Sequence, residues 1–95
     1  MANSVFKTIT KMGYEQVSSE NERTTFRKKQ KGCVFTVIFN AKENYINGIL
    51  IPVSSVTERR DLIYLYAGWK NLIIDMKYLS NLTGYSIINN IEEDE

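Results

Sequence analysis

The side chains that usually carry enzyme chemistry are scarce in this sequence. The 95-residue chain contains no histidine, a single cysteine (Cys33) and only isolated glycines. Nucleophile pairs that need histidine, the commonest metal ligand and a glycine-rich phosphate loop are therefore missing. Glu58 and Asp61 flank Arg59 and Arg60, a pattern typical of a solvated helix start where acids complement the helix dipole. We expect no enzymatic activity, no cofactor and no metal site.

Cys33 is the one residue that keeps an enzymatic alternative open. It begins the apolar run CVFTVIF, and free cysteine is among the residue types most often buried, which favours a structural role. Lys29 and Lys31 would lower the pKa of the thiol if it were exposed. A single cysteine forms no internal disulfide, which is typical of a reducing compartment.

A basic segment, residues 23–31, offers a different chemistry. Its sequence RTTFRKKQK indicates a strand whose cations could contact phosphates and so position nucleic acid without reading its sequence. No aromatic residue alternates with the cations, and the net charge of the chain is only +1. We favour an exposed hairpin kept soluble by its lysines, with nucleic-acid binding as the alternative. The candidate phosphate-binding residues are Arg23, Arg27, Lys29 and Lys31.

The register of this hairpin follows from its apolar residues. Lys31-Gly32 can form the turn within the predicted β segment 24–39. An even loop places Phe26 on the face shared by alternate residues of the second strand, whereas an odd loop places Arg27 beside Phe35. Burial of one apolar face favours the even loop. The predicted core face holds Phe26, Cys33, Phe35, Val37 and Phe39; the outer face holds Thr25, Arg27, Lys29, Val34, Thr36 and Ile38; and Lys28 snorkels at the core rim.

Shorter elements precede and follow this hairpin. Residues 4–12 are predicted to form a helix with Val5, Ile9 and Met12 on one face, which ends at Gly13. YEQVS is predicted to be extended and SSENE to be a turn or short loop. A further strand, YINGILI at 45–51, follows the loop AKEN and ends at Pro52.

The last third of the chain is dominated by a predicted long helix. Ser55 and Glu58 have the spacing of a capping box, and Gly84 is a suitable stop. A rival interpretation makes DLIYLY a strand and begins the helix near Trp69, but the unbroken helical phase favours one helix. YSIINNI is either a last short strand or a packed tail. The apolar stripe consists of Leu62, Leu65, Tyr66, Trp69, Leu72, Ile73, Met76 and Leu79.

The predicted architecture is α+β. A short N-terminal helix, an antiparallel sheet of three or four strands and a long C-terminal helix packed on the sheet form one domain, residues 1–95. The acidic tail, residues 92–95, is expected to be flexible. The first twenty residues lack the apolar core of a signal peptide and no run is long enough to span a bilayer, so we expect a cytoplasmic protein without membrane contact.

A second face of the long helix is also apolar or aromatic. A helix that is apolar on most sides must be covered on most sides, and in so small a domain the sheet covers only one. Either the first helix and the tail cover the other side, or a partner chain does. The candidate partner-binding residues are Ile63, Tyr64, Trp69, Ile74 and Tyr78.

The layout resembles small accessory proteins carried by phages and prophages of Gram-positive bacteria. The resemblance rests on a short helix ending in MGYEQV, a basic strand RTTFRKK, a second strand within VFTVIFNAKENY and a final helix. The long aromatic helix LIYLYAGWKNLIIDMKYL departs from the shorter, more polar helix of such proteins. The resemblance implies no conserved site and no enzymatic activity. It implies an accessory role, such as binding and inhibiting a host or defence protein.

Two functions from different classes follow from the sequence. The first is a small non-enzymatic module that binds a host protein, as a phage accessory or anti-defence factor, or that binds a second copy as a homodimer. The second is a nucleic-acid-binding protein that uses the basic hairpin 23–31.

Overall fold

The computed structural model describes residues 3–53 and 58–88 and confirms the α+β prediction. A short helix is followed by four antiparallel strands, a long helix and a short fifth strand. The elements are α1 (Asn3–Lys11), β1 (Glu15–Glu20), β2 (Arg23–Gln30), β3 (Cys33–Asn40), β4 (Tyr45–Pro52), α2 (Arg59–Thr83) and β5 (Ser86–Ile88).

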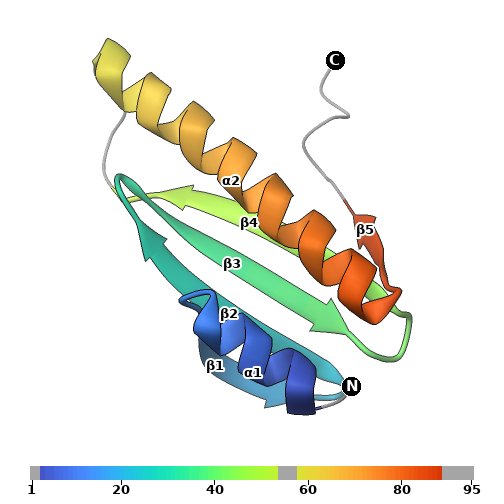
Figure 1. The fold of residues 1–95 in the computed structure, drawn as a ribbon. Helices are drawn as coiled ribbons and strands as arrows, with labels where there is room; N and C mark the ends of the chain where they lie inside the picture. The colour runs from blue at the N-terminus through green and yellow to red at the C-terminus, as the bar shows by residue number, and fades with distance from the viewer. Residues whose placement is uncertain (1–2, 54–57, 89–95) are drawn as a thin grey trace.

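The sheet follows the order of the chain, β1-β2-β3-β4-β5, and β5 runs parallel to β4. Both helices lie on the same face of this sheet, α1 beside β1 and β2 and α2 across β3 and β4 (Figure 1). The molecule therefore has two layers, with the core between the helices and one sheet face. None of the helices in the described part of the chain is long and apolar enough to cross a membrane.

The even-loop register of the basic hairpin is confirmed. Gln30 pairs with Cys33, so Lys31-Gly32 is a two-residue turn, and Phe26 lies opposite Val37. Gly32 has a φ of +81°, a conformation that residues with a side chain rarely adopt. The fully buried side chains come from both layers: Ile9, Phe26, Cys33, Phe35, Val37, Phe39, Ile46, Leu72, Met76 and Leu79.

Two glycines let α2 approach the sheet. A Cβ on Gly48 of β4 would lie 2.3 Å from the sulfur of Met76, and one on Gly68 of α2 would lie 3.0 Å from the sulfur of Cys33. A side chain at Gly48 would displace the Met76 side chain, and one at Gly68 would crowd the buried Cys33, since protein interiors are close-packed. The two glycines thus allow close packing between the layers.

The prediction for SSENE is wrong in its extent. Residues 18–20 continue β1, and only Asn21 and Glu22 form the turn, with φ of +53° and +64°. Two successive positive φ values are typical of a two-residue hairpin turn, which sequence patterns reveal mainly when glycine is present. A register shift between Gln16 and Ser18 adds a bulge to this strand.

The single long helix is confirmed, and the rival strand at DLIYLY is wrong. Glu58 is the residue that caps α2, and its backbone N–H donates to the carboxylate of Asp61 at 3.0 Å. Ser55, predicted to open the helix, lies outside the described residues, as does the acidic tail 92–95. The helix ends at Gly84, where φ is +79° and the N–H donates to the Ser80 carbonyl.

Candidate functional site

A cluster of ionisable side chains lies just after the C-terminal end of α1. It connects three elements, namely the start of β1, β2 and α2. The Tyr14 hydroxyl donates to the Asp75 carboxylate of α2 at 2.8 Å. The Lys28 ammonium of β2 lies 3.4 Å from the same carboxylate and donates to the Met12 carbonyl at 3.1 Å. It also stands 4.9 Å from the centre of the Tyr14 ring, within cation–π range.

This cluster is a structural tie rather than a reactive site. Burial, the hydrogen bond to Asp75 and the negative charge of Asp75 together raise the pKa of Tyr14 well above its ordinary value. A phenol held protonated in this way cannot act as a base at neutral pH. Its hydrogen bond instead fixes the start of β1 against α2. The snorkelling Lys28 predicted from the sequence is one of the three members.

Cys33 is fully buried beneath α2, and burial raises the pKa of its thiol. Since the thiolate is the reactive form, such a cysteine is a poor nucleophile. Among the described residues there is also no cluster of three or more potential metal-ligating side chains.

The four basic candidates do not form one surface. Arg23, Arg27 and Lys29 share the outer face of β2, as the register predicts. Lys31 instead places its ammonium 4.7 Å from the centre of the Tyr64 ring of α2. The register also brings acids beside the patch, because Glu20 of β1 pairs with Arg23 and Glu15 pairs with Arg27. These paired carboxylates weaken the attraction of the face for phosphate.

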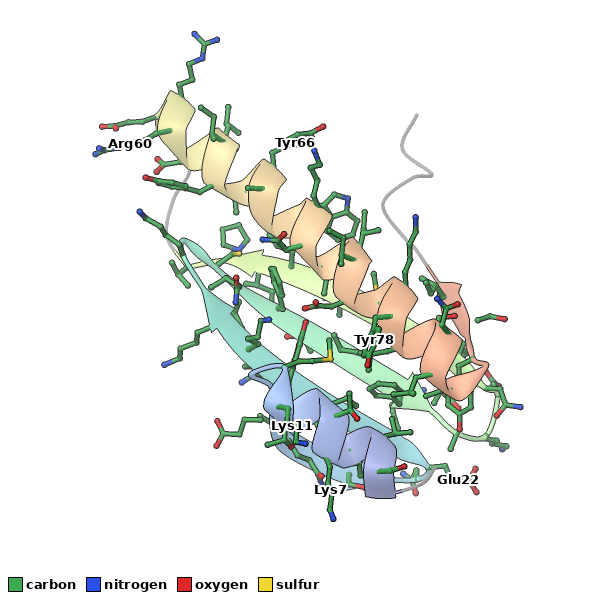
Figure 2. All side chains as sticks on the ribbon, in the orientation of Figure 1. Lys7, Lys11, Glu22, Arg60, Tyr66 and Tyr78 are labelled. Carbon is green, nitrogen blue, oxygen red and sulfur yellow. The ribbon has the colours of Figure 1, made fainter. Side chains whose placement is uncertain are left out.

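The five predicted partner-binding residues are spread around α2. Tyr66 projects from the side away from α1 and Tyr78 from the side toward it (Figure 2). At about 100° per residue, Tyr64 and Tyr78 lie on the side of Asp75, which faces α1 and β2. Trp69 lies about 140° from Tyr64, toward β4. The two isoleucines, Ile63 and Ile74, are 59% and 63% exposed on the back of the helix.

Trp69 belongs to an apolar groove between α2 and β4. The groove has a volume of about 460 Å³ and is open to solvent. Its lips are the most exposed part, since Leu62 is 59% exposed and Tyr66 is 67% exposed. Its lining consists of Leu50, Leu62, Leu65, Tyr66 and Trp69. We call this feature the β4–α2 groove.

The edge of β4 beside this groove is paired only in part. β5 pairs with the residues from Tyr45 to Asn47, and no described strand pairs with the outer edge of β4 from Gly48 to Pro52. The sequence of this edge, GILIP, has no charged residue, although charges are a usual protection against strand pairing. The proline, Pro52, is the last residue of this edge.

At alternate residues of this edge, the backbone N–H and C=O groups point away from β3 toward the outer side of the sheet. The Ser86 N–H donates to the Asn44 carbonyl at 3.1 Å, which shows that the carbonyl of residue 44 faces β5. Since successive residues in a strand direct their backbone groups to opposite edges, Gly48 and Leu50 direct theirs to the same side. The β4–α2 groove therefore combines an apolar lining with a ready hydrogen-bonding edge.

Sequence reasoning grouped part of this groove with residues that prove to be buried. Leu62 and Tyr66 belong to the apolar helical stripe that also contains the buried Leu72, Met76 and Leu79, and they are its most exposed members. The missing information is the tertiary pairing of β4: in the described part of the chain, β5 pairs only with the residues from Tyr45 to Asn47. The uncharged run GILI was the one visible signal, because a long apolar edge invites pairing.

Comparison of the chain with family models, with curated proteins and with solved structures finds no match. The resemblance to phage accessory proteins thus gains no support from these comparisons.

Proposed function

We propose that this protein is a non-enzymatic protein-binding module that captures an extended segment of a partner in the β4–α2 groove. The observation that carries the proposal is the uncharged edge of β4 from Gly48 to Pro52, which pairs with none of the strands that the structure describes and lies beside an apolar groove. A strand added to this edge gains backbone hydrogen bonds from the sheet, and its alternate side chains enter the groove.

The chemistry of the partner segment follows from the two sides of β4. On the helix side, Leu50, Leu65 and Trp69 favour an apolar side chain. On the outer side, Ile49 and Ile51 are 38% and 48% exposed and would flank the added strand. The expected partner is therefore an extended segment with apolar residues at alternate positions and little charge.

The test uses a defined peptide and the tryptophan of the groove. Trp69 is the only tryptophan in the chain, so its fluorescence reports on this site. The probe is a ten-residue peptide with isoleucine at alternate positions, and its control has the same composition with the isoleucines adjacent. We expect the alternating peptide to change the Trp69 emission and to bind more tightly than the scrambled one.

Two substitutions of similar exposure separate the groove from the rest of the helix. Leu62→Glu places a charge on the lip of the groove, and Ile74→Glu places one on the back of α2. We expect the first to weaken peptide binding by about tenfold or more, and the second to leave it unchanged, because a desolvated charge opposes strand capture. Equal effects of both changes, or no preference for the alternating peptide, would contradict the proposal.

A second copy of the chain is an alternative partner, as the predicted homodimer. Two β4 edges could pair with each other, and the Leu62→Glu variant would then dissociate the dimer in light scattering while Ile74→Glu would not. A role as a phage accessory or anti-defence factor is a proposal that rests only on the resemblance of the layout. In that case, the partner segment would belong to a host protein.

A further inference from the structure

Two exposed cations of α2 flank the β4–α2 groove. At about 100° per residue, Arg59 and Lys70 lie about 20° and 40° from Tyr66 around the helix, on the side that carries the lip of the groove. Along the helix, Arg59 comes about one turn before Leu62, and Lys70 directly follows Trp69. One cation therefore stands at each end of the groove lining.

The charge of Lys70 is held at the lip by an aromatic ring. Its ammonium lies 5.4 Å from the centre of the Tyr66 ring, which is within cation–π range. Tyr66 itself lines the groove, so the positive charge is within reach of a bound segment. A side chain that is already held in this way loses less freedom on binding than one that is extended in solvent.

No acid of α2 lies beside these two cations. Asp61 and Asp75, the acids within the helix, lie about 140–200° from them around the axis. Glu58, which caps the helix, pairs with Arg60 instead at 2.9 Å, and β4 has no charged residue. In the described part of the chain the two cations form no ion pair, so the charge along the groove is positive.

We propose that the β4–α2 groove captures an extended partner segment whose apolar core has an acidic residue at each end. We rest this inference on the proposed function, to which it adds the charge of the partner. The apolar side chains enter the groove beside Leu50 and Trp69, one carboxylate meets Arg59 and the other meets Lys70. Backbone pairing alone does not choose a register, and complementary charges at the two ends supply that choice.

The distance between the two cations sets the spacing of the acids. Arg59 and Lys70 are separated by about 16 Å along the helix axis, and an extended segment covers this distance in about five residues. Side chains on one face of a strand have a period of two, and the long cationic side chains can reach acids that are six residues apart. The expected pattern is an acid, two apolar residues at alternate positions and a second acid.

A second copy of the chain does not offer this pattern through its own β4 edge. The strand YINGILIP, residues 45–52, contains no acid. A pair of β4 edges would therefore leave Arg59 and Lys70 of both copies without carboxylates. The charge of the groove favours a different protein as the partner over the homodimer.

Three capped peptides of seven residues test the inference through the fluorescence of Trp69. Each has isoleucine at its third and fifth positions and threonine between, and its two ends are both glutamate, both glutamine or both lysine. We expect the affinity to fall in that order, with the glutamate peptide bound about fivefold more tightly than the lysine peptide at low salt. The difference should shrink at about 0.5 M salt, because the paired charges are exposed and screened.

Lys70→Glu reverses one charge at the groove, and Lys7→Glu on α1 is the matched control. Lys7 is exposed on α1, whereas Tyr66 projects from the side of α2 away from α1 (Figure 2). Both variants change the net charge equally. Lys70→Glu should weaken the glutamate peptide and strengthen the lysine peptide until the two bind with similar affinity, and Lys7→Glu should keep the original order. Equal effects of the two variants would overturn the inference.

The same peptides separate this inference from the proposed function. Equal binding of all three by the unmodified protein would overturn the acidic ends and leave strand capture standing. A fourth peptide keeps the glutamate ends but has its two isoleucines adjacent. If it binds as tightly as the alternating glutamate peptide, and the lysine peptide binds more weakly, recognition of the acids is sustained and strand capture is refuted. Binding of none of the four would refute both.

Discussion

At the scale of single residues, Tyr14 shows how one hydroxyl joins distant parts of the chain. Its partner Asp75 is 61 residues away, and the pair lies where α1, β1 and α2 meet. Lys28 shares the same carboxylate, so the cluster holds one charge of each sign together with a neutral phenol. A partly buried charge pair with an additional donor is more stable than the pair alone, because the carboxylate gains another hydrogen bond.

Tyr14→Phe should therefore lower the free energy of unfolding. Removing a hydrogen bond to a charged group costs about 1.5–3 kcal/mol, and the phenylalanine ring keeps the packing. Urea unfolding at pH 7 measures this difference. Asp75 keeps its contact with Lys28 in the variant, so the loss should stay within this range. An unchanged midpoint would show that the hydroxyl is not bound in solution.

The pH dependence of this difference has a definite sign. The pKa of Tyr14 is raised in the folded protein, first by burial and then by the hydrogen bond and charge of Asp75. The unfolded tyrosine loses its proton near pH 10, so above that pH the unfolded state is favoured. The difference in the free energy of unfolding between the unmodified protein and Tyr14→Phe should then shrink as the pH rises from 9 to 11. Cys33 also has a raised pKa, which lowers the free energy of unfolding of both proteins equally in this pH range.

At the scale of elements, the β1–β2 turn is the least favourable local conformation in the sheet. Asn21 tolerates its positive φ of +53°, but Glu22 at +64° has no such preference. Both side chains are exposed, and Figure 2 shows Glu22 at the tip of this hairpin. The chain accepts this cost because the strands on both sides of the turn pair from Glu20 and Arg23 onward.

Glu22→Gly should stabilise the protein by about 0.5–1 kcal/mol, since Asn-Gly is the preferred pair for a turn with two positive φ values. Thermal unfolding measures the change. Lys42→Gly is the control and should gain nothing, because Lys42 is exposed in the loop between β3 and β4 and its own φ is not positive. A loss of stability in Glu22→Gly would contradict the backbone geometry of this turn.

Sequence patterns predicted those elements whose residues agree with their final environment. The β2–β3 register followed from one apolar face, and the single helix followed from its unbroken phase. The same reasoning failed where the burial of a residue depends on which other elements pack against it. Periodicity placed Leu62 and Tyr66 with the core residues, but burial depends on how far the sheet extends beneath the helix. Of the two alternatives for YSIINNI, the last short strand is confirmed at Ser86–Ile88, but its sequence did not indicate that it would pair with β4.

At the scale of the whole molecule, the distribution of charge bears on the nucleic-acid alternative. The first 31 residues carry seven cations and three acids, whereas the remainder carries five cations and eight acids. The basic face of β2 is therefore local, and the register places Glu15 and Glu20 beside it. Long-range attraction to a polyanion is weak for a molecule of net charge +1.

We expect no retention of a 20-base DNA or RNA at about 0.15 M salt, where screening acts over about 8 Å. The double variant Glu15→Gln with Glu20→Gln tests the cause, because it raises the net charge by two without touching the cations. Binding that appears in this variant and is lost again with Arg27→Ala would show that the acids suppress the patch. Tight binding by the unmodified protein at this salt concentration would instead favour the nucleic-acid function.

The agreement between strand order and chain order has a kinetic consequence. The first four strands are joined by three short hairpin connections, so most sheet contacts close small loops. Such local contacts form quickly, because little chain entropy is lost in each closure. β5 is the exception, since it joins β4 only after the 25 residues of α2 have crossed the sheet. The four-stranded meander should therefore assemble early, and the parallel strand at the edge should be the last part of the sheet to form and the first to detach.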